Sequence, residues 1–433
     1  MFKKFYIIVL SLILITSTNT VLANESKEGP PQNELIKVNI STSEDVEPVT
    51  LSLCKALELA KANNLNIAIK KDQVEENKLK LDEVKNKRLF LFFKFVNSGA
   101  LQKSAKYSIE ASTSSLRTTE NNVLAESSAK YFNLLQTLLT KQVAKDFLKR
   151  GENSLIETKK LLEEGHATKF DVKQTEVFVE GLKQKLLEAE IAYMLSSVDI
   201  AQYINAKVFN TNIIPEECQY NAKDSKDINI KILNLIPDDL LLNDSVDYAL
   251  KHRPELEELN CKIKSLEELI IATKNDDIKV KTLESQISQL HNTYNLTQNG
   301  IKTTVTKSLL QVIGAKNQID VAQNKYNLSI KALEQAKMAR IEGFSANKDI
   351  LDAHVNLATS KNDYYKAIIS YNIAQINLLK ELGLIDIAIL NDNKTIELPS
   401  IVSENLNGFE DPVKTLNKNI LDITEHAKDI NKE

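Results

Sequence analysis

The chain has 433 residues, of which 42% are hydrophobic and 26% are charged, and it contains no tryptophan. The formal net charge of −4 argues against a nucleic-acid-binding surface, and the 6% of aromatic residues excludes a large aromatic core. The sequence has no phosphate-binding loop, no nucleophile elbow and no dinucleotide fingerprint. We therefore do not expect an enzyme.

Residues 1–23 have the pattern of an export leader. Lys3 and Lys4 precede an apolar run at 5–15, and the residues at 21–23 fit a cleavage site. The run is shorter than a membrane-spanning helix requires. We expect an exported mature chain, with an uncleaved anchor as the alternative. No cysteine follows the junction, so a lipid anchor is not indicated.

The cysteines and histidines form no motif. No two cysteines make a C-x-x-C pair, and the histidines lack the spacing of a zinc motif. We interpret all of them as structural residues and expect neither a metal nor a cofactor. They are Cys54, Cys218, Cys261, His166, His252, His291, His354 and His426.

Two long windows, 49–214 and 255–398, contain no proline. They are rich in good helix formers, and apolar residues recur at steps of three and four, as at Leu283, Ile287 and Leu290. Because proline breaks helix interiors, this pattern predicts long helices with a narrow, coiled-coil-like seam. The expected fold class is mainly α, with little or no β structure.

The sequence repeats itself. Residues of the first half recur 178 positions later, for example Tyr193 as Tyr371, and an upstream match has a shift of 189. Each copy is expected to hold a helix of about 30 residues, a connection, a very long helix (100–164 or 278–342) and a returning helix. The expected division is a leader 1–23, a linker 24–49, a first helical repeat 50–205, a linker 206–239, a second helical repeat 240–383 and a C-terminal tail 384–433.

The turns after the long helices share a pattern, "EEGHATKFDV" and "IEGFSANKDI". Gly165 and Gly343 would supply the left-handed conformation that ends a helix. Asp171 and Asp349 would lie in the first turn of the returning helix, where a carboxylate is favourable. Capping explains Asp171 fully, but it does not explain Asp352, one turn further on.

A resemblance to the TolC family of outer-membrane efflux proteins is carried by the segments 51–67, 129–145, 163–177, 189–205 and 341–357. The resemblance implies a homotrimer whose helices form a periplasmic tunnel under a β-barrel in the outer membrane. It also implies partnership with a periplasmic adaptor (membrane fusion) protein and an inner-membrane pump. By this resemblance, Asp349 and Asp352 would form the gate at the entrance of the tunnel. The tips that contact the adaptor would include Gly165, Asp171, Gly343 and Asp349.

The chain departs from the family in the connections before the long helices. These are about residues 86–99 and 275–277, and neither can hold two membrane strands of 9–11 residues. The barrel strands are therefore expected to be shortened or missing. Strands within 101–120 remain an alternative, because "KYSIEAST" alternates briefly.

The first connection holds "LFLFFKFV", the most apolar stretch of the mature chain. It would form an apolar crown that touches membrane or a partner, or else a crossover buried in the bundle. The crown residues are Phe90, Phe92, Phe93 and Phe95.

The sequence thus predicts an internally duplicated, TolC-like helical protein of the outer membrane and periplasm. We expect it to be a trimeric tunnel in a tripartite efflux or type I secretion system. The alternative is a non-transporting periplasmic coiled-coil structural or spacer protein derived from the same fold. A periplasmic adaptor fits less well, because adaptors carry one helical hairpin and glycine-rich β domains.

Overall fold

The computed structural model describes residues 49–86, 98–204, 213–216, 230–237, 240–274, 276–342, 346–392 and 395–396. All of them belong to one compact unit, Val46–Glu433. The expected leader, the four crown phenylalanines and Gly343 lie outside the described residues.

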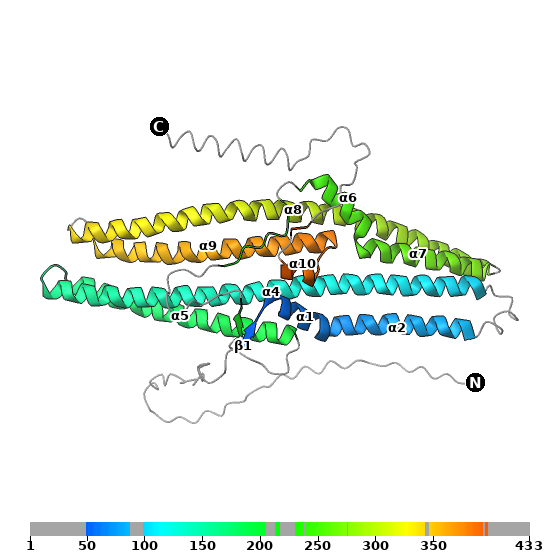
Figure 1. The fold of residues 1–433 in the computed structure, drawn as a ribbon, viewed down its shortest axis with the longest axis horizontal. Coiled ribbons are helices and arrows are strands. Elements are labelled where there is room, and N and C mark those ends of the chain that lie inside the picture. Colours follow the sequence, from blue (N-terminus) through cyan, green and yellow to red (C-terminus); the bar gives the residue numbers. More distant parts are fainter. Residues whose placement is uncertain are drawn as a thin grey trace, which may run out of the picture. The chain divides into compact units, whose positions relative to one another are not determined.

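The helices fall into two equivalent series, as the internal duplication predicts (Figure 1). The first series is α1 (Leu53–Asn63), α2 (Leu65–Asn86), α4 (Ser98–Glu163) and α5 (Lys169–Tyr203). The second series is α6 (Leu242–His252), α7 (Pro254–Thr273), α8 (Asp277–Ile341) and α9 (Asn347–Leu382). The other elements in the part of the chain that the structure describes are the strands β1 (Val49–Leu51) and β2 (Ile213–Pro215) and the short helix α10 (Ile387–Asp392).

The two long helices are confirmed almost to the residue. α4 has 66 residues and α8 has 65, so each is about 97–99 Å long at about 1.5 Å per residue. The strand alternative within 101–120 is wrong, because the alternating stretch 106–113 lies inside α4. The buried residues there, Ser104, Ala111 and Ser114, follow a helical period instead of a period of two.

Each expected 30-residue helix is broken into two by a joint. The first joint is Asn64 and the second is Arg253, and both have extended backbone angles. Pro254 explains the second break, because a proline disfavours the helical conformation in the residue before it. At each joint a side chain donates to a carbonyl at the end of a returning helix: Asn63 to Ile204 at 3.2 Å, and Arg253 to Glu381 at 3.0 Å.

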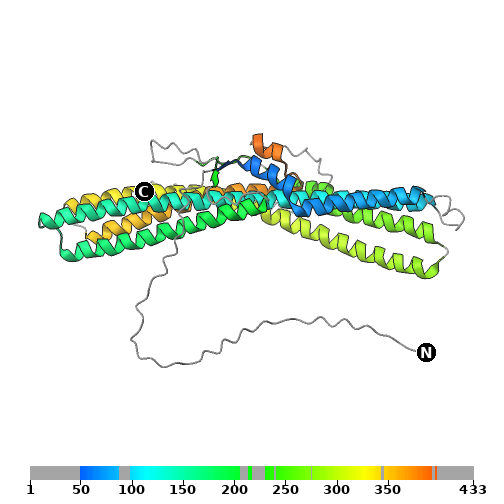
Figure 2. The same ribbon diagram turned by 90° about the horizontal axis from the view of Figure 1, so that it is seen from below.

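The long helix α4 organises the packing. Over one half it lies beside α5 and α9, and over the other half it lies beside α2 and α7 (Figure 1 and Figure 2). α8 pairs with α9 in the first half and with α7 in the second. The core is centred where the halves meet, and Leu134, Leu135 and Leu139 of α4 pack there in one cluster with Ile369 and Ile376 of α9.

The two strands form a small parallel ladder, with Val49 opposite Ile213 and Leu51 opposite Pro215. Buried tyrosines fix it to the helices. Tyr131 of α4 donates to the carbonyl of Leu51 at 3.1 Å, and Tyr193 of α5 donates to the carbonyl of Ile213 at 2.8 Å. The ladder therefore joins the start of the first series to the segment that follows it.

Residues 230–236, which we call the strap, are held against α9 by two buried side-chain amides. Asn372 accepts from the N–H of Leu233 at 2.9 Å and donates to the carbonyl of Lys231 at 3.0 Å. Gln375 accepts from the N–H of Leu235 and donates to the carbonyl of Leu233, both at 2.8 Å. Asparagine and glutamine here replace the backbone partners that a β-ladder would supply.

Replacing Gln375 with leucine is expected to lower the free energy of unfolding by about 3 kcal/mol. The side chain is 0% exposed, so its loss leaves the N–H of Leu235 and the carbonyl of Leu233 buried without partners. Urea denaturation followed by circular dichroism measures the change. Gln184→Leu is the matched control, because Gln184 is exposed and its amide donates to the exposed Glu188. Equal effects of the two substitutions would contradict the role given to the strap.

Candidate functional site

The candidate site is the pair of helical-hairpin tips, where α4 turns into α5 and α8 turns into α9. In the first tip, Gly165 has φ +79°. Its N–H donates to the carbonyl of Leu162 at 3.1 Å, and the N–H of His166 donates to that of Leu161 at 2.8 Å. This pair of bonds is the Schellman ending of a helix, so Gly165 serves the turn as the sequence predicted.

Asp171 completes a capping box at the start of α5. Its carboxylate accepts from the N–H of Thr168 at 2.9 Å, while the Thr168 hydroxyl accepts from the N–H of Asp171 at 3.2 Å. The bond from the Thr168 N–H lowers the pKa of Asp171; burial opposes this, and the Thr168 hydroxyl and the charge of Arg340 reinforce it. The capping interpretation of Asp171 fits this geometry.

The second tip is capped more weakly. The carboxylate of Asp349 accepts from the N–H of Ala346 at 2.8 Å, but alanine has no hydroxyl to return the bond. Asp352 is exposed and makes no hydrogen bond or ion pair with any residue that the structure describes. The two carboxylates thus differ: one is held by the backbone, and the other is free of partners in the described part of the chain.

Asn347 joins the two tips, which sequence reasoning missed. Its amide donates to the hydroxyl of Thr175 at 3.0 Å and approaches the carbonyl of Asp171 at 3.4 Å. Asn347 is 4% exposed and Thr175 is 0% exposed, so the bridge is buried. The only signal in the sequence is a break in the internal symmetry, since the position equivalent to Asn347 in the first copy is the exposed Lys169.

Large hydrophobic side chains are exposed around the tips. Phe170 of α5 is 74% exposed and Ile341 of α8 is 87% exposed. Met338, Val177 and Ile156 are also more than half exposed. Phe170 follows the first turn by a few residues and Ile341 ends α8, so exposed apolar side chains lie at both tips.

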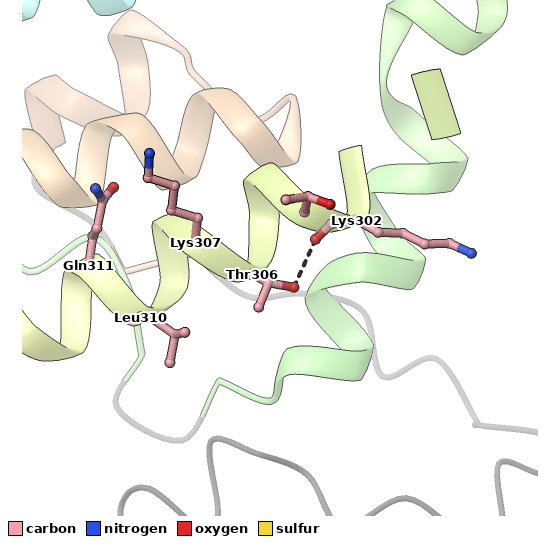
Figure 3. Close-up of a pocket in the computed structure, with 6 residues that line it drawn as sticks. Lys302, Thr306, Lys307, Leu310 and Gln311 are labelled. Carbon is pink, nitrogen blue, oxygen red and sulfur yellow. Dashed lines mark hydrogen bonds between the residues drawn. The ribbon is translucent and has the colours of Figure 1, made fainter. Parts of the chain in front are cut away.

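A separate open hollow lies along the middle of α8, and Figure 3 shows its lining side chains projecting from this single helix. The hydroxyl of Thr306 donates to the carbonyl of Lys302 at 2.8 Å, within the helix itself. No convergent polar set from several elements is present among these lining residues, so we do not treat the hollow as the site. They are Lys302, Thr303, Thr306, Lys307, Leu310 and Gln311.

Within the described residues, no helix has the length and apolar character that crossing a membrane requires.

No protein-family model matches the chain, and no curated protein matches it either. Several solved structures do match in fold. The outer-membrane channel OprN has 12% identity and a TM-score of 0.62, over 76% of this chain and 89% of its own. CusC has 13% identity and a TM-score of 0.64, over 76% and 92%. The CmeC outer-membrane channel of Campylobacter jejuni has 12% identity and a TM-score of 0.60, over 79% and 89%.

The architecture is therefore that of outer-membrane channel proteins. More particularly, it is a TolC-like fold of long paired helices, as the resemblance in the sequence predicted. At these identities the likeness concerns the fold alone.

Proposed function

We propose that the protein is the trimeric periplasmic tunnel of a tripartite efflux or type I secretion system. The fold shared with outer-membrane channels supports this role. The observation that carries the proposal is the exposed apolar surface on the helices at the edges of each half. The described part of one chain leaves these edges uncovered, and further copies of the chain can cover them.

In each half of the bundle the helices lie in a row, and the first and last helix of the row form its edges. In the half with the tips, α4 packs against α5 and α9, and α9 packs against α8, which leaves α5 and α8 at the edges. In the other half, α2 and α8 are the edges. Most of the exposed large hydrophobic side chains lie on these three helices: Leu65, Ile69, Leu79, Phe170, Val177, Leu187, Ile191, Leu195, Ile278, Leu296, Leu310, Val321, Leu328, Met338 and Ile341.

Pairing the α8 edge of one copy with the α2 and α5 edge of the next is a head-to-tail contact. Such contacts close into rings when the rotation permits. A ring of three copies would place long helices around one axis and bury the apolar edges. This geometry is what a tunnel requires.

The trimer is tested by placing charge on one edge. Val321→Lys with Leu328→Lys is expected to give a monomer with unchanged helicity, because both side chains are more than half exposed within one chain. Light scattering should give about three times the mass of one mature chain for the parent and one chain mass for the variant. The control is Ile156→Lys on α4, between the edges, which should remain trimeric. A parent that is monomeric at micromolar concentration would overturn the proposal.

The tips would form the entrance and meet the adaptor. The exposed side chains of Phe170 and Ile341 offer it an apolar contact beside the capped turns. Threefold symmetry would bring three copies each of Asp349 and Asp352 around the axis. We therefore propose a cation-selective constriction at the second tip, closed at rest and opened when an adaptor packs between the hairpins of Gly165 and Gly343.

A further inference from the structure

The buried imidazole of His354 has no role in the proposed tunnel. His354 lies on α9, about two turns after Asn347, and is 3% exposed. Its ring lies against Phe147 of α4, with ring centroids 6.5 Å apart. Phe147 in turn meets Phe178 of α5 edge to face at 5.7 Å. The histidine is therefore packed into the contact between the two hairpins.

The packing gives the imidazole no acceptor at one nitrogen. Nδ1 of His354 is buried and has no hydrogen-bond partner among the described residues. A buried polar atom without a partner costs free energy, and a buried charge without a partner costs more. The contact thus tolerates the neutral ring and disfavours the imidazolium.

The charges that act on His354 make protonation still harder. Burial, the largest cause, and the charges of Lys337 of α8 and Arg150 of α4 together lower its pKa from 6.5 to about 4. On α9 itself, Asp352 is exposed to solvent. From α5, the acidic groups near the tip are engaged elsewhere: Asp171 in its cap, and Glu176 with lysines.

The contact of α9 with α4 and α5 is the seam between the hairpins: on one face of α9, Asn347 bonds to Thr175 of α5 and His354 lies against Phe147 of α4. We propose that this seam is an acid-sensitive contact, in which protonation of His354 places a third positive charge beside Arg150 and Lys337 and separates the two hairpins. The acid sensitivity is a property of the chain's own packing. Only its use as an acid-opened entrance rests on the function proposed above.

Proton binding decides in which direction pH shifts the equilibrium between the closed and the separated seam. A separated seam frees the histidine to bind a proton near its ordinary pKa of 6.5, whereas the closed seam does so near 4. Acid therefore favours separation, and the effect begins as the pH falls below 6.5. Between pH 7.5 and pH 5, the ratio of separated to closed seam is expected to rise about 30-fold.

The test is the chemical accessibility of a buried seam residue. Leu351, three residues before His354 and 5% exposed, is replaced by cysteine in a chain whose Cys54, Cys218 and Cys261 are alanine. Its rate of reaction with 4,4′-dithiodipyridine is divided by that of an exposed cysteine at position 348 at the same pH. This ratio reports rare opening of the seam and cancels the reagent's own pH dependence.

We expect the ratio to rise about 30-fold from pH 7.5 to pH 5 in the parent and to stay within about twofold in His354→Phe. His166→Gln, on the exposed first tip, should behave as the parent does. If circular dichroism shows His354→Phe to be unfolded, His354→Gln takes its place, since it is neutral at both pH values. A flat ratio in the parent, or a rise that survives removal of the histidine, would overturn the inference. Because the assay needs no conductance, its failure is distinct from failure of the tunnel.

Discussion

Replacing Asp349 and Asp352 together with asparagine is expected to remove the cation preference of the conductance while leaving the fold intact. In the proposed trimer, six carboxylates converge on one axis, where they repel one another and attract cations. Asparagine removes the charge but keeps an oxygen that can accept from the N–H of Ala346, as Asp349 does at 2.8 Å. The free energy of unfolding should therefore change by only about 1 kcal/mol, since what is lost is the attraction between an exposed carboxylate in the first turn and the helix dipole, typically about 0.3–1 kcal/mol.

The measurement is the reversal potential of the purified protein in a planar bilayer under a potassium chloride gradient. Asp171→Asn is the matched control, because it makes the same chemical change in the first tip and should leave selectivity as it was. If the double variant loses several kcal/mol of stability and keeps its selectivity, the aspartates are caps and the gate proposal fails. A parent that conducts no ions would favour a spacer protein built on the same fold.

Arg253→Met is expected to lower the free energy of unfolding by about 3–5 kcal/mol, the usual cost of leaving one partner of a buried ion pair alone. The guanidinium bonds to Glu381 at 2.6 Å and to Glu255 at 2.8 Å, and its side chain is only 11% exposed. It also donates to the backbone carbonyl of Glu381 at the end of α9. The substitution therefore removes the contact that holds the second joint to the returning helix.

Thermal melting of Arg253→Met beside Arg117→Met checks the magnitude. Arg117 pairs with Glu257 at 2.8 Å, but both side chains are 52% exposed, so its loss should cost about 0–1 kcal/mol. Burial tends to raise the pKa of Glu381, yet the bonds and charge of Arg253 hold it below its ordinary value. The pair therefore stabilises the fold above pH 4.5 and loses its effect as the pH falls below that value, so the two variants should converge in acid. Equal melting shifts at pH 7 would contradict this.

The sequence predicts the long helices well because their signal is local. The absence of proline and the steps of three and four decide α4 and α8 without reference to the rest of the chain. The turn at Gly165 and the cap at Asp171 are local in the same way, since the bonds that form them join residues at most six apart.

The two helix breaks and the contacts of Asn347 and His354 were not predicted from the sequence. The break at Arg253 has a local signal in Pro254, whereas Asn64 is followed by leucine and has no such signal. The contacts of Asn347 and His354 depend on distant segments. Asn347 bonds to Thr175, 172 residues earlier, and His354 matters only because Phe147 packs on it. From the sequence alone, His354 was one of five unremarkable histidines. The aspartate gate and the apolar crown remain predictions.

The strap has a consequence for the order of folding. Its partners on α9 lie 139–142 residues further along the chain, and the carbonyl of Leu235 accepts from the N–H of Ile396, later still. A chain that emerges from its amino end cannot complete these bonds until nearly all of it has arrived. Contacts of such long range fold slowly, because loop closure must come before they stabilise anything. The middle of the bundle should therefore be the last part to become protected from hydrogen exchange, after both hairpins have formed.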